Sequence, residues 1–225
     1  MDTRLQLLTN WVRQFPGFEQ SEAEPVSGDA SFRRYFRVWQ HANQATAPGN
    51  GVPFIVMDAP PEHEDCEPFV AIARHWHHQG IAVPEIIQAD LKQGFLLLED
   101  FGDQLMLGQL TADSADQLYR KALEELTLIA RQPSPEDYPL RPYDATLLER
   151  EMALFPDWLL ERHLGMRLEN SERALLDTTF SILRESALAQ PEVTVHRDYH
   201  SRNLLVRPNE PRPGVIDFQD AVIGP

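Results

Sequence analysis

The chain has 225 residues, 42% of them hydrophobic, which suffices for one large domain or two small lobes with a sizeable core. A formal net charge of -15 argues against nucleic acid or an anionic membrane as a partner held by a general electrostatic field. Nucleotide binding stays compatible with this charge, because a phosphate group needs only a few local donors. Cys66 is the only cysteine, which excludes a disulfide framework within the chain and fits a reducing compartment.

The first residues predict an amphipathic helix rather than a signal peptide. Leu5, Leu8, Val12 and Phe15 lie near helical spacing, and this segment has no long apolar run. No stretch of the sequence reaches the apolar length that a membrane-spanning helix needs. We therefore expect a cytoplasmic protein without a membrane partner, and the oligomeric state stays open.

The rest of the first hundred residues predicts a small antiparallel sheet with one inserted helix. Residue alternation indicates the strand at 34–39, a short apolar run indicates the strand at 54–57, and Gly80 is the expected stop of the helix. The expected strands cover residues 34–39, 54–57, 85–89 and 95–98, and the expected helix covers residues 64–79.

The second half of the chain predicts mostly helices with a small β element near the end. The expected helices cover residues 113–132, 144–164 and 171–190, and the short strands cover residues 193–195, 204–206 and 215–218. Pro156 forces a break or a new first turn inside the second of these helices.

Two segments near the end of the sequence carry the most specific pattern. VTVHRDYHSRNLLV contains Asp198 and, five residues later, Asn203, and GVIDFQD places Asp217 at the end of an apolar strand. This is the catalytic-loop and metal-strand arrangement of the kinase fold. Each residue taken singly fits a loop cap or a strand end, but the fixed spacing of the whole set favours a catalytic function.

The chemistry of phosphoryl transfer explains why these residue types occur together. Transfer to a hydroxyl needs a carboxylate near the attacking oxygen, and it needs magnesium to neutralise charge on the nucleotide phosphates. Magnesium prefers hard oxygen ligands, usually one or two from the protein. We therefore predict that Asp198 is the catalytic base, that Asn203 and Asp217 bind Mg2+, and that ATP is the phosphoryl donor.

The motifs HRDYHSRNLLV and GVIDFQDAVIGP resemble those of the aminoglycoside phosphotransferase/choline kinase superfamily. With SGDASFRRYFRV, IVMDAPPE, GFLLLED and LFPDW, the chain is most similar to the bacterial anomeric kinases of N-acetylmuramate and N-acetylglucosamine in peptidoglycan recycling. The resemblance implies an amino-sugar acceptor. It extends to Pro225, and family members continue with further helices, so it implies that C-terminal helices are missing from this chain.

The expected fold class is α+β, a two-lobed protein-kinase-like architecture. Residues 1–102 are predicted to form the N-terminal nucleotide-binding lobe and hinge, and residues 103–225 a truncated helical C-terminal lobe with the catalytic loop. Asp100-Phe101-Gly102 spells the metal-binding triplet of protein kinases but precedes the catalytic loop. It follows an apolar strand at the expected hinge, so we predict that backbone groups near Glu99 and Phe101 face adenine.

The predicted phosphate-binding loop departs from the glycine-rich pattern of protein kinases. Small residues still permit a tight turn with N–H groups that face an anion. The nucleotide contacts expected from this loop are Ser27, Gly28, Asp29, Ala30, Ser31, Phe32, Arg33 and Arg34.

Kinases usually have a lysine in the third strand. The chain has only Lys92 and Lys121, and neither lies in that strand. Arginine must then provide the phosphate-binding charge, and Arg33, Arg34 and Arg37 are the candidates. Their alternative role is solvent-facing charge on a strand. The absence also keeps open a catalytically silent, nucleotide-binding pseudokinase.

Candidates for acceptor contact are Arg197, His200 and Arg202, with Trp158 as an apolar face for a sugar or, equally, as a core residue. His75 and His78 share a helix face, but no third ligand is evident, so a solvated face is the better interpretation than zinc. Another acceptor, such as an aminoglycoside, choline or a protein hydroxyl, stays open as an alternative.

Overall fold

The computed structural model describes residues 2–28, 32–41, 51–208 and 210–225. They group into two compact units. Unit 1 comprises Met1–Thr127 and Asp198–Asp220, and unit 2 comprises Leu128–Arg197 and Ala221–Pro225. These units interleave along the chain, so the division at residue 102 that the sequence indicates stays a prediction.

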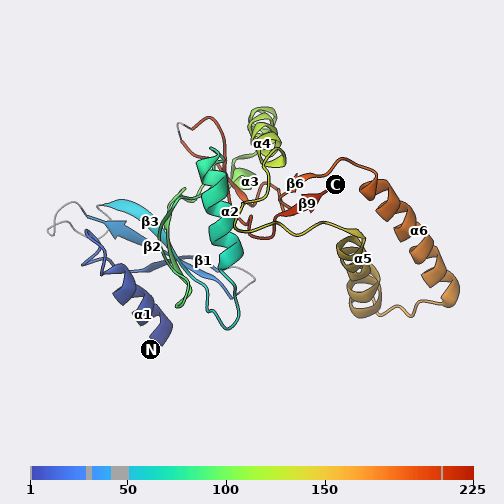
Figure 1. Cartoon of the computed structure of the whole chain (residues 1–225), viewed down its shortest axis with the longest axis horizontal. Coiled ribbons are helices and arrows are strands. Elements are labelled where there is room, and N and C mark those ends of the chain that lie inside the picture. Colours follow the sequence, from blue (N-terminus) through green and yellow to red (C-terminus); the bar gives the residue numbers. More distant parts are fainter. Residues whose placement is uncertain (1, 29–31, 42–50, 209) are drawn as a thin grey trace. The chain divides into compact units, whose positions relative to one another are not determined.

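The helices and strands predicted from the sequence are present in the predicted order, together with further elements such as α3 and β9 (Figure 1). The helices are α1 (Thr3–Val12), α2 (Glu67–His78), α3 (Met106–Gln109), α4 (Ala115–Ala130), α5 (Ala145–Leu154), the π-helix η1 (Phe155–His163) and α6 (Asn170–Leu188). The strands are β1 (Glu24–Gly28), β2 (Arg34–Gln40), β3 (Val52–Asp58), β4 (Ile86–Asp90), β5 (Phe95–Glu99), β6 (Val193–Val195), β7 (Leu204–Leu205), β8 (Gly214–Val215) and β9 (Val222–Gly224).

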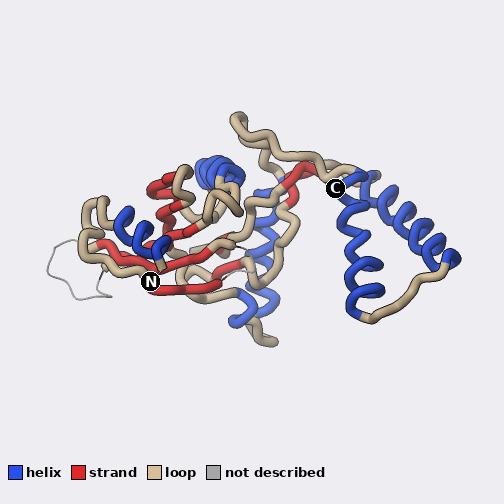
Figure 2. Tube along the Cα trace, turned by 90° about the horizontal axis from the view of Figure 1, so that it is seen from below, coloured by secondary structure: helices blue, strands red, loops and turns tan. Residues whose placement is uncertain are grey.

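Five strands of unit 1 form one sheet in the order β1-β2-β3-β5-β4, and every neighbouring pair is antiparallel (Figure 2). Strands β3 and β5 pair in the centre, with Val56 opposite Leu97. Strand β5 is buried along most of its length, and the residues of the predicted hinge follow directly after it. The antiparallel sheet predicted from residue alternation is confirmed.

Helix α1 packs on one face of this sheet. Leu8 and Val12 join Phe36, Val56 and Leu97 in a buried hydrophobic cluster. Strand residues alternate between the two faces, so this cluster uses every second residue of the central strands. Asp2 caps the helix by accepting a hydrogen bond from the backbone N–H of Leu5 at 3.1 Å. The amphipathic N-terminal helix is therefore confirmed.

Helix α2 connects the sheet with the segment that follows Asp217. Phe218 is fully buried, and its ring centroid lies 4.8 Å from that of Phe69 and 5.7 Å from that of Trp76, both on α2. Gly80 has a φ of 77° just beyond this helix, as its predicted role as a stop requires. These contacts with α2 hold the chain in place directly after Asp217, a predicted metal ligand.

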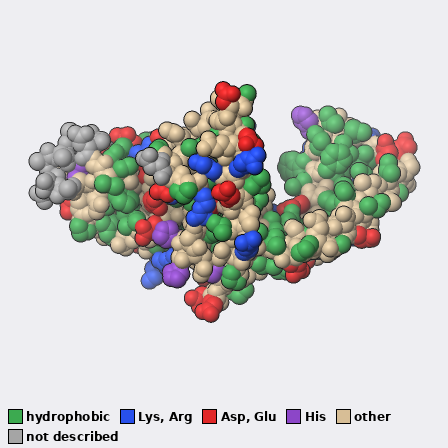
Figure 3. Space-filling model, turned by 90° about the horizontal axis from the view of Figure 1, so that it is seen from above, with side chains coloured by type: hydrophobic (Ala, Val, Ile, Leu, Met, Phe, Trp, Pro, Cys, Tyr) green, Lys and Arg blue, Asp and Glu red, His purple; other side chains and the backbone are tan. Residues whose placement is uncertain are grey.

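Unit 2 contains helices with largely exposed apolar side chains. None of the residues of α5, η1 and α6 is buried, and Trp158, Leu175 and Ile182 are more than half exposed. Figure 3 shows hydrophobic side chains spread over this part of the surface. Pro156 lies in the first turn of η1, so the break predicted at this proline is present as a change from α-helix to π-helix.

Two details of the late β element differ from the prediction. The strand expected over residues 215–218 ends at Val215, because Asp217 adopts a φ of 64° and leaves the extended region. Strand β9 was not expected, and it pairs with β6 so that Val193 faces Gly224. None of the described helices combines the length and apolar character needed to cross a membrane.

Candidate functional site

The β7–β8 hairpin places Asn203 and Asp217 next to each other. Leu204 pairs with Val215, and the backbone N–H of Ile216 donates to the carbonyl oxygen of Asn203 at 3.1 Å. Asn203 immediately precedes one strand, and Asp217 lies just beyond the other. Antiparallel pairing thus brings together two residues that are far apart in the sequence.

The side-chain amide of Asn203 joins the predicted base to the second predicted metal ligand. Its Nδ2 lies 3.0 Å from Oδ2 of Asp198 and 3.2 Å from Oδ2 of Asp217. The same nitrogen lies 3.0 Å from the backbone oxygen of Asp198. The three residues that the sequence pattern singles out therefore form one contiguous polar cluster.

Asp217 is held in an unusual backbone conformation. Its φ of 64° lies in the left-handed region, which aspartate tolerates better than most residues other than glycine. Gln219 Nε2 donates to Asp217 Oδ1 at 2.7 Å, and the buried ring of Phe218 anchors the next residue. Sequence reasoning missed Gln219, although its position two residues beyond Asp217 is a usable signal.

The loop that carries Asp198 is tied to α4 and α3. The hydroxyl of Tyr199 donates to the carbonyl oxygen of Ala122 at 2.7 Å, and Leu107 N–H donates to Ser201 O at 2.9 Å. Burial, together with the carboxylate of Glu125, raises the pKa of the Tyr199 phenol. Tyr199 therefore acts as a neutral donor that anchors the loop, a role that sequence reasoning missed.

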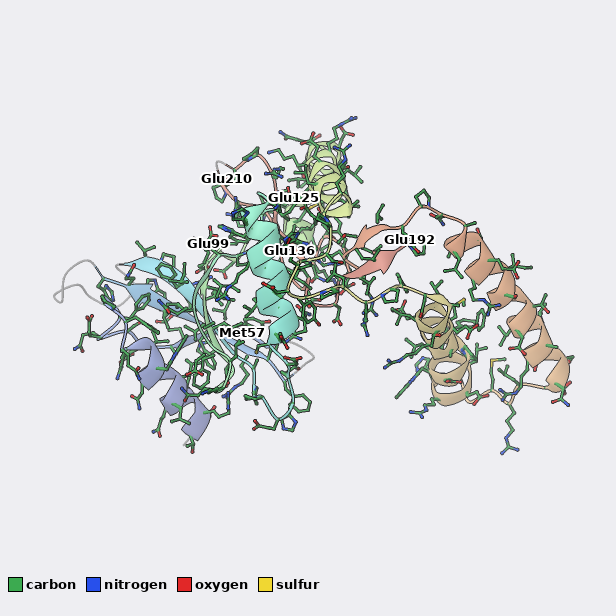
Figure 4. All side chains as sticks on the ribbon, viewed as in Figure 1. Met57, Glu99, Glu125, Glu136, Glu192 and Glu210 are labelled. Atoms are coloured by element: carbon green, nitrogen blue, oxygen red, sulfur yellow. The ribbon has the colours of Figure 1, made fainter. Side chains whose placement is uncertain are left out.

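Glu125 of α4 is a fully buried carboxylate (Figure 4). It accepts a hydrogen bond from Ala82 N–H at 2.6 Å, and its Oε2 lies 2.7 Å from Arg212 NH1. Burial raises the pKa of the Glu125 carboxyl, although the contacts with Ala82 and Arg212 act in the opposite direction. Because Val215 N–H donates to Ala82 O at 2.7 Å, this network braces the β7–β8 hairpin. No local spacing of residues in the sequence predicts this network.

The three residues predicted to contact the acceptor have different surroundings. Arg197 has a φ of 73° and forms an ion pair with Glu151 of α5. Arg202 is exposed, and its backbone N–H donates to Nδ1 of His200 at 3.3 Å. His200 Nε2 lies 3.1 Å from Oδ1 of Asp198. The side chain of His200 thus lies next to the predicted base, and acceptor contact stays a prediction for all three residues.

The predicted hinge contains a tightly packed aromatic ring. Phe101 is buried, with the guanidinium of Arg207 4.5 Å from its ring centroid. A Cβ atom at Gly214 would lie 2.3 Å from this ring, so the close approach of the β8 backbone requires glycine. Glu99 N–H already donates to Glu85 O at 2.9 Å. Adenine contact at Glu99 and Phe101 stays a prediction, and the N–H of Glu99 itself is engaged elsewhere.

Asp100, the aspartate of the misleading triplet, forms an ion pair with Arg37 of β2. Arg37 Nε lies 2.5 Å from Asp100 Oδ2, and its two terminal nitrogens lie 2.8 and 2.9 Å from the carboxylate of Asp103. The hydrogen bonds that the guanidinium of Arg37 donates to Asp103 and Asp100 raise its pKa above the ordinary value. Arg37 thus clamps the sheet to the hinge segment.

The other two candidate phosphate-binding arginines also have carboxylate partners. Arg33 pairs with Glu64 at 3.0 Å, and Arg34 pairs with Asp58 at 2.5 Å and with Asp2. Phe32 N–H donates to Glu64 at 3.2 Å. A phosphate contact by any of these arginines stays a prediction.

The predicted phosphate-binding loop is only partly described. Ser27 and Gly28 end β1, where they pair with Tyr35 and Arg34. The predicted contacts at Asp29, Ala30 and Ser31 lie outside the described residues.

His75, His78 and Trp158 are the remaining candidate side chains named from the sequence. Across the described ranges, no group of three or more His, Cys, Asp or Glu side chains is arranged to hold a metal ion. His78 is exposed, whereas Nε2 of His75 is buried, so the solvated helix face predicted for this pair holds only in part. Trp158 is 55% exposed in unit 2, with the guanidinium of Arg162 4.0 Å from its ring centroid. Its role as a sugar-binding face stays a prediction.

Comparison with known sequences identifies relatives. Residues 22–225 match the family described as "Phosphotransferase enzyme family". The N-acetylmuramate/N-acetylglucosamine kinase of Pseudomonas putida is 44% identical over 234 residues, which cover 100% of this chain and 65% of that protein. The protein of the same name from Pseudomonas aeruginosa is 48% identical over 205 residues, 91% of this chain and 57% of that protein. The chain therefore spans less than two thirds of these relatives.

Comparison with solved structures identifies the fold. An ADP-bound aminoglycoside phosphotransferase matches with a TM-score of 0.63 at 13% identity, over 100% of this chain and 72% of that one. A choline/ethanolamine kinase family protein from Mesorhizobium loti matches with a TM-score of 0.62 at 13% identity, over 98% of this chain and 66% of that one. At such identities the likeness shows the fold alone, and it confirms the expected α+β, protein-kinase-like class.

Proposed function

Because this chain belongs to the phosphotransferase enzyme family, we propose that it carries the catalytic centre of an ATP-dependent small-molecule kinase. The observation that carries this proposal is the amide of Asn203, which lies 3.0 Å from the carboxylate of Asp198 and 3.2 Å from that of Asp217. The arrangement supplies a base next to an amide and a carboxylate suited to a metal ion, which are the parts that phosphoryl transfer requires.

The donor set fits magnesium and a nucleotide. Asn203 and Asp217 offer hard oxygen atoms, and Mg2+ commonly takes one or two such protein ligands with phosphate oxygens and waters. When bound, the ion neutralises negative charge on the nucleotide phosphates.

Asp198 is the group that receives the proton. Its side chain is 55% exposed, so an acceptor hydroxyl can reach it. The hydroxyl oxygen forms a new bond to the γ-phosphorus, and the bond from that phosphorus to the β–γ bridging oxygen breaks. ADP leaves with the electron pair of the broken bond, and the carboxylate of Asp198 takes the hydroxyl proton.

For the acceptor we propose the anomeric hydroxyl of N-acetylmuramate and N-acetylglucosamine. The names of the 44% and 48% identical relatives support this choice. An anomeric hydroxyl is more acidic than an ordinary alcohol, so an aspartate is a sufficient base. N-acetylmuramate also carries a lactyl carboxylate, for which an exposed cation such as Arg202, four residues after Asp198 in the sequence, is a suitable partner.

A catalytically silent nucleotide-binding protein is the second candidate, and one observation favours it. Strand β3 has the sequence VPFIVMD, without the lysine that usually contacts the phosphates. The three nearby candidate arginines each carry a carboxylate partner instead. The intact cluster of Asp198, Asn203 and Asp217 argues for catalysis.

Release of ADP from magnesium-ATP distinguishes these candidates. The purified protein is offered N-acetylmuramate, N-acetylglucosamine, an aminoglycoside and choline in parallel, with chelation of magnesium as the control. We expect magnesium-dependent ADP release with the two amino sugars. Tight nucleotide binding without ADP release for any acceptor would favour the silent candidate.

A further inference from the structure

His200 contacts the predicted base through one ring nitrogen. Its Nε2 lies 3.1 Å from Oδ1 of Asp198, within the loop that joins β6 to β7. The two residues are separated by a single position, so the loop itself brings the imidazole to the carboxylate. His200 is about half exposed, as is Asp198, which means that both side chains lie where an acceptor can approach.

The other ring nitrogen of His200 has a partner that fixes the tautomer. The backbone N–H of Arg202 donates to Nδ1 at 3.3 Å, so Nδ1 serves as an acceptor and carries no proton. In a neutral imidazole the proton then resides on Nε2, the atom that faces Asp198. The nitrogen that then carries the proton lies 3.1 Å from Asp198 Oδ1.

The carboxylate of Asp198 is consequently held at both oxygens. Asn203 Nδ2 donates to Oδ2 at 3.0 Å, and His200 Nε2 lies 3.1 Å from Oδ1. A carboxylate oxygen can accept more than one hydrogen bond. An exposed aspartate in a loop otherwise samples several rotamers, and a misplacement of about 1 Å can reduce a rate about 100-fold.

We propose that His200 is a positioning residue that orients the carboxylate of Asp198 for proton transfer, rather than a residue that binds the acceptor. The proposal rests on the kinase function proposed above. Both ring nitrogens already have contacts within the loop, so contact with an acceptor would require the loss of one of them. The role is filled by a hydrogen-bond donor at the position of Nε2 and does not require a charged side chain.

Steady-state kinetics of His200→Ala and His200→Gln test this role. We expect His200→Ala to lower kcat about 10- to 100-fold with little change in the KM values for ATP and the acceptor. A glutamine amide can donate from the place of Nε2, so His200→Gln should recover most of the lost kcat. His77→Ala, an exposed histidine on α2, is the matched control and should behave like the wild type.

A double-mutant cycle separates positioning from an independent role. If His200 acts through Asp198, His200→Ala should have almost no further effect in an Asp198→Asn background. An undiminished loss in that background, a rise in acceptor KM alone, or wild-type kcat in His200→Ala would each overturn the proposal.

A second readout does not depend on turnover, so it stays informative if the proposed kinase function is wrong. In protein labelled with nitrogen-15 histidine, NMR at mildly alkaline pH should assign the proton of His200 to Nε2. The Nε2 resonance should shift in Asp198→Ala but not in Asp113→Ala, where an exposed aspartate is replaced. A proton on Nδ1, or no response to Asp198→Ala, would contradict the positioning contact whatever the activity.

Discussion

At the scale of single residues, the tasks proposed for Asp198, Asn203 and Asp217 are separable although their side chains touch. Asn203 donates to both carboxylates through one nitrogen. A carboxylate that accepts a proton acts only in the transition state, whereas a metal ligand also acts when the nucleotide binds. Substitutions of the two aspartates should therefore have different kinetic signatures.

Asp198→Asn should abolish most turnover while nucleotide binding stays nearly intact. The substitution keeps the shape of the side chain but removes the carboxylate that receives the proton, a contribution of about 100- to 10,000-fold. ADP release and ADP affinity measured on the same sample check this, with Asp113→Asn as the control on the exposed surface. Near-normal turnover at saturating substrate would show that Asp198 is not the base.

Asp217→Asn should instead weaken magnesium-dependent nucleotide binding. The loss of one negative oxygen removes a charge from the proposed metal site, so ADP affinity should fall most when magnesium is present. Titration calorimetry with and without magnesium measures the difference. If the variant bound ADP as the wild type does under both conditions, Asp217 would have no part in metal binding.

Arg37 illustrates how the structure changes the interpretation of a residue. The sequence makes it a candidate phosphate ligand, whereas its guanidinium contacts Asp100, whose side chain is 2% exposed. Arg37→Ala should lower the free energy of unfolding by about 3 kcal/mol, because it leaves a buried carboxylate without its guanidinium. Arg34→Ala should cost less, since the buried carboxylate of Asp58 retains Arg4 at 2.5 Å. Chemical denaturation compares the two variants.

The pH dependence of stability tests the ion pair between Arg37 and Asp103. Hydrogen bonds from Arg37 lower the pKa of the Asp103 carboxyl below its ordinary value. Its contribution to stability is therefore present above a pH of about 4 and disappears as the pH falls through the lowered pKa. Asp103 is 67% exposed, so the contribution is at most about 1 kcal/mol. A stability difference between wild type and Asp103→Asn that persisted at low pH would contradict this origin.

At the scale of elements, local patterns predict the helices and strands but not the long-range pairings. Helical spacing of Leu8 and Val12 identifies α1, and both residues are buried. Strand β9 has only three residues and is defined by pairing with β6, so no local alternation reveals it. The same reason explains why the buried Glu125 was missed, since its partner Arg212 lies far along the chain.

Phe218 links α2 to the candidate site, and its truncation should affect the whole of unit 1. Its fully buried ring packs between Phe69 and Trp76, so Phe218→Ala should cost about 3 to 5 kcal/mol of stability. Phe155→Ala is the matched control, because this phenylalanine is 44% exposed on η1 and should cost well under 1 kcal/mol. Equal losses in thermal unfolding would show that Phe218 is not a central packing residue.

At the scale of the whole molecule, the motifs predicted the fold class and the family, and the acceptor has no comparable signature. The contacts of Asn203 with both aspartates follow from spacing that a single sequence displays. A sugar pocket is assembled from side chains of several elements, and Trp158 and Arg202 carry no spacing that would join them. The choice of an amino sugar therefore depends on relatives of which this chain spans 57% to 65%.

Phosphorus NMR of the reaction product tests the central claim most directly. The purified protein is incubated with magnesium-ATP and N-acetylmuramate or N-acetylglucosamine, and the coupling of phosphorus to the sugar protons assigns the phosphorylated oxygen. We predict a sugar 1-phosphate from both amino sugars, and its loss in Asp198→Asn. A sugar 6-phosphate, or transfer to an aminoglycoside or choline in place of both amino sugars, would contradict phosphorylation at the anomeric hydroxyl.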